Sequence, residues 1–376
     1  MPHLRRAHPP PGPVPPLAGY TVAIASDRRR HPLAGLLESV GARTVGVQAA
    51  RSVATPDPAA LRAATSACLA GPCHEVVISS ALGLRAWLAA ARAAGQAGEL
   101  VGRFRTARLL ARDAAAADGL RRLGLTGIYS TDRETSEELL RYLLAQRPLA
   151  GRRVVVQTNQ LALAEPCAGL RRAGAEVIEV PTFTAAPPAE AYSLRRLTDL
   201  VIRRQVDALA LVGGPVAGQL RGQAARAGRL GPLLAALAGD VLCAALGPLT
   251  AAALTGAEPL LADRPHVEEL AEALLTRLPP RALAVTTGGH ELELRGHAVV
   301  LDGRLLPVQP GPLAVLRALA RRPGQVLSSA DLRAAIPDRA TVDDHAVEMA
   351  VSRLRQALPG ADLVQTIVKH GYRLVR

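Results

Sequence analysis

The chain of 376 residues has few aromatic residues and a single lysine, Lys369. Aromatic residues make up 2% of the sequence, so any core must be built mainly from aliphatic side chains and alanine. The four cysteines form no Cys-x-x-Cys pair and have no histidine at ligand spacing; they are Cys68, Cys73, Cys167 and Cys243. This pattern argues against a disulfide scaffold and a zinc site, and it predicts buried, reduced thiols in a reducing cytoplasm. We expect no metal and no cofactor.

A hydrophobic segment suited to crossing a membrane is also lacking. The longest apolar stretch, residues 233–254, is mostly alanine and contains Asp240, Gly247 and Pro248. An Asp at the centre of a span costs about 2.5–3.5 kcal/mol on insertion scales, which alanine does not offset. Residues 1–18 are basic and then rich in proline, where a signal peptide needs an apolar stretch, so we expect a disordered tail there. The sequence predicts a cytoplasmic protein with no membrane partner.

Acidic residues are outnumbered by basic ones, and the formal net charge is +13. An Ala-, Arg-, Gly- and Pro-rich composition is typical of a GC-rich genome, so solvated basic faces explain part of this charge. The alternative is a surface for a polyanionic partner such as nucleic acid. Both interpretations stay open on composition alone.

The body of the chain contains an internal duplication with an offset of about 132 residues. YTVAIAS leads to a helical segment that ends near Gly41, and RRVVVQT leads to one that ends near Gly174. Further matched segments follow in the same order, which disfavours chance similarity between Ala-rich stretches. Short β-branched runs alternate with helical segments that stop at glycine, a pattern typical of parallel sheets with helices on both faces. In such sheets, ligands bind at the carboxyl ends of the strands.

The order of these motifs resembles the uroporphyrinogen-III synthase family over about residues 20–278. The resemblance rests on the Gly-Ala turns, EVPTFTAAPP, VVISSALGLRAW, and LGPLTAAAL followed by HVEELAEALL. It implies an α/β fold of two Rossmann-like lobes with parallel sheets, joined by a two-stranded linker. The first lobe would take residues 19–52 and 182–278, and the second lobe residues 53–181.

The resemblance also implies a reaction, because this family closes the linear tetrapyrrole hydroxymethylbilane into a ring without a metal or cofactor. The substrate carries carboxylates, which backbone N–H groups and hydroxyl side chains can bind. The positions that match the family's ligand cleft are Ser79, Ser80, Phe183, Gly213, Gly214, Gly247 and Thr250.

Several of these positions depart from the family's pattern. Phe183 stands where many members have a tyrosine, and Gly213 and Gly214 replace a Thr-Ser pair, whereas Gly247 and Thr250 keep a Gly-Pro-x-Thr motif. Each lost donor can cost roughly 10²- to 10³-fold in rate. We therefore assign no catalytic residue, and three interpretations stay open: an active synthase, a cleft that binds a small anionic or tetrapyrrole-like ligand, and a purely structural body. For Thr250, a helix-capping role and a ligand contact are equal alternatives.

Residues 292–376 have a different pattern, preceded by an expected linker over residues 279–291. LELRG, HAVVLDG and RLLPVQ alternate apolar and polar residues, which predicts a small antiparallel sheet. An amphipathic helix, a short helix capped by Ser328 or Ser329, a helix over about 342–358 and a closing hairpin are expected next. With QPGPLAVLRALARRPGQVLSSADL, VEMAVSRLRQAL and VKHGYRLV, this region resembles the winged-helix DNA-binding domain of response regulators.

The third predicted helix has an apolar stripe formed by Val347, Val351, Leu354 and Leu358. The resemblance implies that its other face enters the major groove of double-stranded DNA, where Ala346 and Ala350 replace longer residues, and that the hairpin reaches the neighbouring backbone or minor groove. The residues expected to contact DNA are His345, Met349, Ser352, Arg353, Gln356, Lys369, His370 and Arg373. A solvated turn is the alternative for the hairpin, whose turn is expected at His370-Gly371, and Arg355 is expected either to touch DNA or to pair with Asp331.

These observations favour a transcriptional regulator in which a synthase-like body senses a small ligand. Regulators of this kind act on repeated half-sites, so we expect a homodimer. The alternative is an active synthase with an appended DNA-binding domain. A resemblance to actinobacterial synthase-like regulators implies control of nitrogen or nitrate assimilation. Phosphorylation is an unpromising switch, because the body has neither the acidic cluster nor the lysine that a receiver domain needs.

Overall fold

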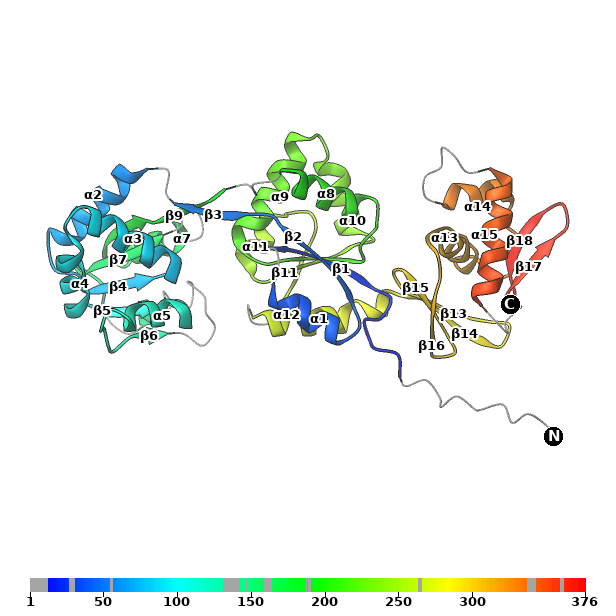
Figure 1. Cartoon of the computed structure of the whole chain (residues 1–376), viewed down its shortest axis with the longest axis horizontal. Coiled ribbons are helices and arrows are strands. Elements are labelled where there is room, and N and C mark those ends of the chain that lie inside the picture. Colours follow the sequence, from blue (N-terminus) through cyan, green and yellow to red (C-terminus); the bar gives the residue numbers. More distant parts are fainter. Residues whose placement is uncertain are drawn as a thin grey trace.

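The computed structural model describes residues 13–26, 31–54, 57–130, 139, 142–145, 148–158, 164–186, 188, 191–262, 266–336, 343–358 and 362–376. They form two parallel five-stranded sheets, a two-stranded linker between them, and a C-terminal domain with an antiparallel sheet and a hairpin. Figure 1 shows these bodies in a row, with the first parallel sheet in the middle. The α/β fold with a C-terminal winged-helix domain is confirmed.

The middle body, here called lobe 1, draws its sheet from two distant parts of the chain. The sheet order is β12-β11-β10-β1-β2, and all neighbouring strands are parallel. The strands are β1 (Thr21–Ser26), β2 (Arg43–Gln48), β10 (Ala208–Leu211), β11 (Leu242–Ala245) and β12 (Leu260–Leu261). The helices are α1 (Pro32–Ser39), α8 (Ala191–Ile202), α9 (Gly214–Arg226), α10 (Leu230–Ala238), α11 (Pro248–Ala252) and α12 (Val267–Arg277).

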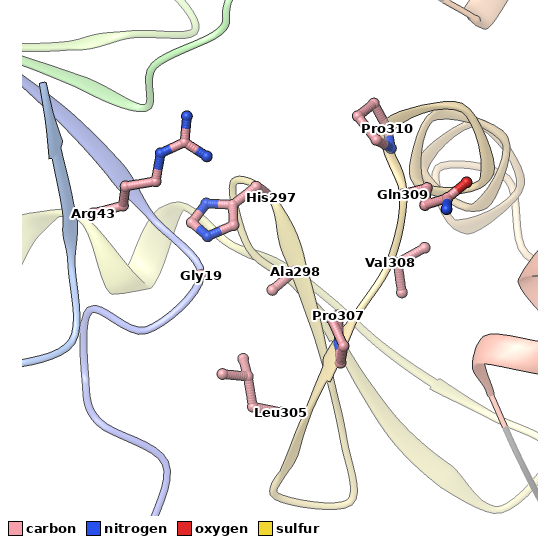
Figure 2. Close-up of a pocket in the computed structure, with 9 residues that line it drawn as sticks. All are labelled: Gly19, Arg43, His297, Ala298, Leu305, Pro307, Val308, Gln309 and Pro310. Atoms are coloured by element: carbon pink, nitrogen blue, oxygen red, sulfur yellow. The ribbon is translucent and has the colours of Figure 1, made fainter.

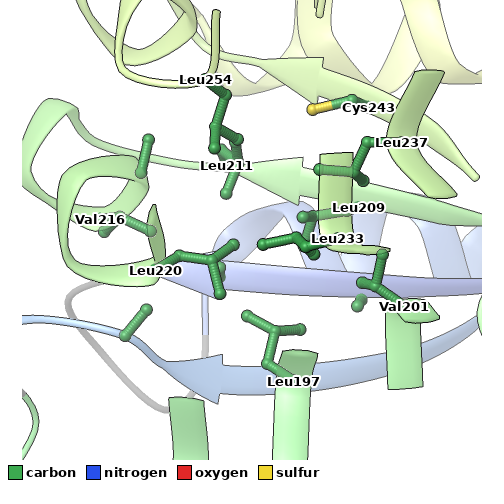
Figure 3. Packing of buried hydrophobic residues seen from close by; sticks show 14 of the residues in the cluster. Leu197, Val201, Leu209, Leu211, Val216, Leu220, Leu233, Leu237, Cys243 and Leu254 are labelled. Atoms are coloured by element: carbon green, nitrogen blue, oxygen red, sulfur yellow. The ribbon is translucent and has the colours of Figure 1, made fainter. Parts of the chain in front are cut away.

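Lobe 1 has one aliphatic core on each face of its sheet. Helices α1 and α12 cover one face, and α8, α9, α10 and α11 cover the other (Figure 1). Figure 3 shows the second core, where Leu197, Leu209, Leu220 and Leu233 interdigitate without an aromatic ring. All six residues of β1 are buried, as expected for a central parallel strand.

The second parallel sheet belongs to lobe 2 and has the order β6-β5-β4-β7-β8. Its strands are β4 (Glu75–Ile78), β5 (Arg108–Ala111), β6 (Tyr129–Ser130), β7 (Arg153–Thr158) and β8 (Glu176–Pro181). Its helices are α2 (Pro58–Leu69), α3 (Ala81–Ala93), α4 (Ala97–Thr106), α5 (Ala114–Arg121) and α7 (Ala164–Arg172). The only tryptophan, Trp87, is fully buried here, and its indole N–H donates to the Thr65 hydroxyl at 3.0 Å.

Two antiparallel strands, β3 (Arg51–Ala54) and β9 (Phe183–Ala186), connect the lobes. β2 runs out of lobe 1 into β3, and β8 runs out of lobe 2 into β9. Because the strands within each sheet are parallel, the carboxyl ends of both sheets lie on the linker side of their lobes (Figure 1). This is the edge at which open α/β sheets bind ligands.

The C-terminal domain begins with an antiparallel sheet of four strands. These are β13 (Leu283–Thr287), β14 (His290–Leu294), β15 (Ala298–Leu301) and β16 (Arg304–Pro307). β13 lies inside the segment expected as a linker, because LAVTT alternates across the sheet and pairs with β14; only η1 (Pro279–Arg281) separates it from α12. The helices and wing strands are α13 (Pro310–Ala320), α14 (Ser329–Ala335), α15 (Asp344–Ala357), β17 (Val364–Ile367) and β18 (Gly371–Leu374).

Local sequence signals explain the helices of this domain. Ser328 caps α14 in a capping box with Asp331. Val347, Val351, Leu354 and Leu358 are buried together, which confirms the predicted stripe of α15. Among the described residues, no helix is long and apolar enough to span a membrane.

The winged-helix domain packs against the amino ends of the lobe 1 strands. The β14–β15 turn brings Gly296 against Asp207, which precedes β10 and accepts a hydrogen bond from the Thr21 backbone N–H at 2.7 Å. The His297 backbone N–H donates to the Gly19 carbonyl at 2.7 Å. Burial raises the pKa of the Asp207 carboxyl above its usual range. We call this contact the joint.

Replacing Gly296 with alanine should loosen the joint, because the new Cβ would collide with the Asp207 carboxylate. We expect hydrogen exchange of peptides covering residues 17–23 and 292–300 to accelerate at least about tenfold, equivalent to about 1.4 kcal/mol of lost protection. Gly311→Ala is the control, because no heavy atom lies within 4 Å of its new Cβ. Equal exchange in the two variants would contradict the role of the joint.

Candidate functional site

The two serines that follow β4 have different environments. Ser80 caps α3, because its hydroxyl accepts from the Gly83 backbone N–H at 3.0 Å. Ser79 is 4% exposed, and its buried Oγ has no hydrogen-bond partner among the described residues. A buried hydroxyl without a partner carries a desolvation cost of about 1–3 kcal/mol that a bound ligand can offset. Of the two predicted ligand residues in lobe 2, Ser79 is therefore the one whose hydroxyl has no partner among the described residues.

A polar network at the same sheet edge was not anticipated from the sequence. The Gln157 amide, on β7, donates to the Ser80 hydroxyl at 3.2 Å and to the Thr182 hydroxyl at 3.1 Å. Gln157 is fully buried, and a Cβ on Gly83 would collide with its amide. The signal for this network was a glutamine at the end of a β-branched run, followed in the next segment by a threonine at the start of the crossing strand. The network orders the carboxyl edge of lobe 2.

The predicted residues of lobe 1 gather at the carboxyl ends of β10 and β11. Gly213 is the N-cap of α9 with φ of 112°, a left-handed conformation that favours glycine over the threonine of the family pattern. Gly214 begins α9, and Gly247 is the N-cap of α11. Thr250 is buried within α11 and is not its cap, because Gly247 holds that position. The capping alternative for Thr250 is therefore wrong.

Phe183 lies between the two groups, as the first residue of β9 and opposite Ala54 of β3. The structure thus brings Gly213, Gly214, Gly247 and Thr250 to one lobe and the serine pair to the other, with Phe183 on the linker. No group of three or more His, Cys, Asp or Glu residues could hold a metal ion within the part of the chain that the structure describes.

The face of α15 opposite the buried stripe presents the expected DNA-contacting side chains to solvent. The exposed residues on this face include His345, Glu348, Met349, Ser352, Arg353 and Gln356. The Arg353 guanidinium lies 3.5 Å from the Gln309 side-chain oxygen and is otherwise open. Their assignment as DNA contacts stays a prediction, which the exposure of this face supports.

One expectation about this helix is wrong, and so is one of the two alternatives for Arg355. Ala350 is 6% exposed and packs in the core with Val351, so it does not lie on the DNA-facing side. Arg355 does not pair with Asp331, whose carboxylate accepts from Ser328 within the α14 cap. Arg355 instead donates to the Val364 carbonyl at 2.7 Å and to the Thr366 hydroxyl at 2.9 Å, which ties α15 to the wing.

The basic residues of the hairpin wing have different environments. Lys369 and His370 are exposed in the turn between β17 and β18, with Lys369 in a left-handed conformation at φ of 66°. Arg373 lies on β18 and donates to the Gln365 side-chain oxygen at 2.9 Å. Gly371 starts β18 against the Leu327 backbone, where a Cβ would collide with the carbonyl oxygen. The turn residues are thus free to approach a phosphate backbone, whereas Arg373 is engaged across the hairpin.

Ser79→Ala and Ser80→Ala should change the stability of lobe 2 in opposite directions. Removing the unpartnered Ser79 hydroxyl is expected to raise the free energy of unfolding by about 1 kcal/mol, because a buried unsatisfied group is lost. Removing the Ser80 cap is expected to lower it by about 0.5–2 kcal/mol. Urea unfolding followed by Trp87 fluorescence reports lobe 2 selectively. A Ser79→Ala variant that is less stable than the unmodified chain would show that this hydroxyl has a structural partner.

Comparisons with known proteins cover both parts of the chain. The family described as uroporphyrinogen-III synthase HemD matches residues 31–272, which is more than half of the chain. The family described as transcriptional regulatory protein, C terminal, matches residues 303–374. No curated protein matches the chain.

Three solved structures illustrate these similarities. The uroporphyrinogen III synthase of Thermus thermophilus is 28% identical, with a TM-score of 0.40, over 68% of this chain and 97% of its own. The DNA-binding domain of Escherichia coli CadC is 27% identical, with a TM-score of 0.22, over 24% of this chain and 90% of its own. The DNA-binding domain of Klebsiella pneumoniae RstA, solved in complex with the RstA box, is 23% identical, with a TM-score of 0.21, over 24% and 96%.

The two family matches agree with the boundary that the fold draws between the parallel sheets and the antiparallel C-terminal domain. This chain therefore belongs to the uroporphyrinogen-III synthase HemD family, and it joins the synthase-like body to a DNA-binding domain of the transcriptional-regulator type.

Proposed function

We propose that the chain is a DNA-binding transcriptional regulator whose synthase-like body binds a small anionic ligand. Two features together support the proposal. The face of α15 is exposed and polar, and glycines stand at the carboxyl end of β10 where the family pattern has hydroxyl donors. A face with Ser352, Arg353 and Gln356 exposed suits base and phosphate contacts in a major groove. The exposure of Lys369 and His370 in the turn of the wing supports a contact with the neighbouring DNA backbone.

The ligand is proposed to bind between the carboxyl edges of the two sheets. Ser79 supplies a buried hydroxyl that lacks a partner among the described residues, and the turn at Gly213 supplies backbone donors without a side chain in the way. Donors of these kinds suit carboxylates, so a small anionic or tetrapyrrole-like molecule is the class of ligand we propose. Its binding would restrain the two lobes about the β3–β9 linker.

The regulatory setting is part of the same proposal. We propose that the chain binds repeated half-sites as a homodimer, as many helix-turn-helix regulators do. The net charge of +13 favours DNA as the polyanionic partner. A cytoplasmic location fits this role. Nitrogen or nitrate assimilation is the process that we propose such a regulator controls, on the resemblance to actinobacterial synthase-like regulators.

Replacing Arg353 with glutamine should weaken binding to DNA at least about tenfold and make the salt slope about one unit shallower, because one cationic contact is lost. Duplexes of about 40 base pairs selected from a random pool supply the probe. For the unmodified chain, log K is expected to fall with log salt at a slope of about −4 to −5.

Arg304→Gln serves as the matched control, because it removes the same charge from an exposed position on β16. We expect less than about a twofold change for this variant. If no duplex is enriched, or if both variants bind equally well, α15 does not read DNA and the proposed function fails.

The second candidate function is an active uroporphyrinogen-III synthase, which family membership and the unpartnered Ser79 hydroxyl favour. Incubation with fresh hydroxymethylbilane and separation of the uroporphyrin isomers distinguishes the two. As a sensor the protein should give only the spontaneous type I product, because Phe183 lacks the phenol and glycines replace two hydroxyls. Type III product above background, increased by Phe183→Tyr, would establish the enzyme instead.

A further inference from the structure

A cavity of about 740 Å³ lies at the joint between lobe 1 and the winged-helix domain. It is lined by residues of both bodies. Gly19 and Arg43 come from lobe 1, and the winged-helix domain contributes His297, Ala298, Leu305 and residues 307–310 (Figure 2). Its volume is within the range of about 300–1,000 Å³ typical of small-molecule sites. The cavity adjoins the amino ends of β1 and β2, so it is separate from the carboxyl edges described above.

One wall of the cavity is cationic and polar. Figure 2 shows the Arg43 guanidinium extending over the His297 ring. Arg43 is exposed, and its guanidinium has no hydrogen-bond or ion-pair partner among the described residues, although its backbone N–H donates to the Tyr20 carbonyl. His297 Nδ1 lies 3.2 Å from the Thr21 hydroxyl; when that hydroxyl donates, Nε2 carries the ring proton and can donate to a ligand.

The electrostatic field at this wall is positive. Burial, followed by the nearby charges of Arg43 and Arg317, lowers the pKa of His297 below its usual range, so the ring is neutral at pH 7. The acidic group of the joint, Asp207, does not line the cavity and is engaged with the Thr21 backbone N–H. An unpaired guanidinium beside a neutral imidazole suits one carboxylate or a similar anionic group.

The other wall is apolar. It is formed by the side chains of Ala298, Leu305, Pro307, Val308 and Pro310. Leu305 is 38% exposed, one of the few large apolar side chains that reach solvent among the described residues. A small inorganic anion would leave this apolar surface exposed to water. An organic anion with an aromatic or aliphatic group would cover it.

We propose that this cavity binds a small organic anion with an apolar body, and that binding there lowers the affinity of α15 for DNA. The acid would meet Arg43 and His297, and the apolar body would pack on Leu305, Pro307 and Val308. The site is distinct from the proposed ligand site between the lobes, and its regulatory effect rests on the proposed DNA-binding function.

The wall segment of residues 307–310 connects the cavity to the recognition helix. It leads directly into α13, and the Gln309 amide points away from the cavity, where its oxygen lies 3.5 Å from the Arg353 guanidinium (Figure 2). A ligand that holds this segment against lobe 1 therefore stabilises the arrangement in which Gln309 holds Arg353. The α13 helix also packs on α15, and the Arg317 guanidinium on α13 donates to the Arg295 carbonyl of the joint at 2.6 Å.

The probe for this site is 4-(trifluoromethyl)benzoate, observed by ¹⁹F relaxation in the presence of the full chain. We expect saturable binding that is at least about tenfold tighter than that of the matched neutral alcohol, because the carboxylate pairs with Arg43. Arg43→Gln should remove that advantage, and Leu305→Asn should weaken both probes. Arg304→Gln, an equal loss of charge outside the cavity, and Ser79→Ala, at the carboxyl edge of lobe 2, should leave the affinity within about twofold.

Equal affinity for the acid and the alcohol, or an affinity that Arg43→Gln leaves unchanged, would overturn the site. Loss of binding in Ser79→Ala but not in Arg43→Gln would place the probe between the lobes, which overturns this inference while supporting the proposed function. With the selected duplex, saturating probe should weaken DNA binding at least about threefold in the unmodified chain and leave Arg43→Gln unaffected. Unchanged DNA affinity with a bound probe would overturn the coupling alone.

Discussion

The parallel direction of the strands in the lobe 1 sheet is the constraint on which the rest of the molecule depends. Because β1 pairs in parallel with both β2 and β10, segments more than 150 residues apart form one sheet with two different edges. The carboxyl edge meets the linker to lobe 2, and the amino edge meets the winged-helix domain through Thr21 and Asp207. Helices cover both faces of a parallel sheet, so other domains can attach at the carboxyl and amino ends of its strands.

Most of the architecture could be predicted, because its signals are local. Alternation of β-branched runs with alanine-rich segments indicates parallel strands and covering helices, and the stripe Val347, Val351 and Leu354 indicates the buried face of α15. The cap at Ser328 has the same local character, since its partners lie within three residues. Strand β13 was not predicted, because the Gly288-Gly289 pair that follows it is typical of a linker. In the structure these glycines form the tight turn of the β13–β14 hairpin.

Polar contacts between distant segments could not be predicted in the same way. Ser79 and Ser80 are neighbours of the same type. The buried Ser79 hydroxyl has no partner among the described residues, whereas the Ser80 hydroxyl caps a helix and accepts from the Gln157 amide. For Arg355 the sequence left a DNA contact and a pair with Asp331 as equal alternatives, and neither anticipated that its guanidinium donates to the Val364 carbonyl. Which backbone atom lies within 3 Å of a side chain is decided by tertiary packing, and no periodicity of the sequence encodes it.

Gly213 and Ser79 follow strands of the two lobes at their carboxyl ends, and they contribute in opposite ways to the stability of the fold. At Gly213 the φ of 112° suits glycine, whereas a residue with a side chain would be strained there. Ser79 is the opposite case, because a buried hydroxyl with no partner among the described residues costs about 1–3 kcal/mol. The carboxyl ends of the strands thus differ between the lobes, because glycine gives lobe 1 an unstrained turn while the Ser79 hydroxyl of lobe 2 is unsatisfied among the described residues.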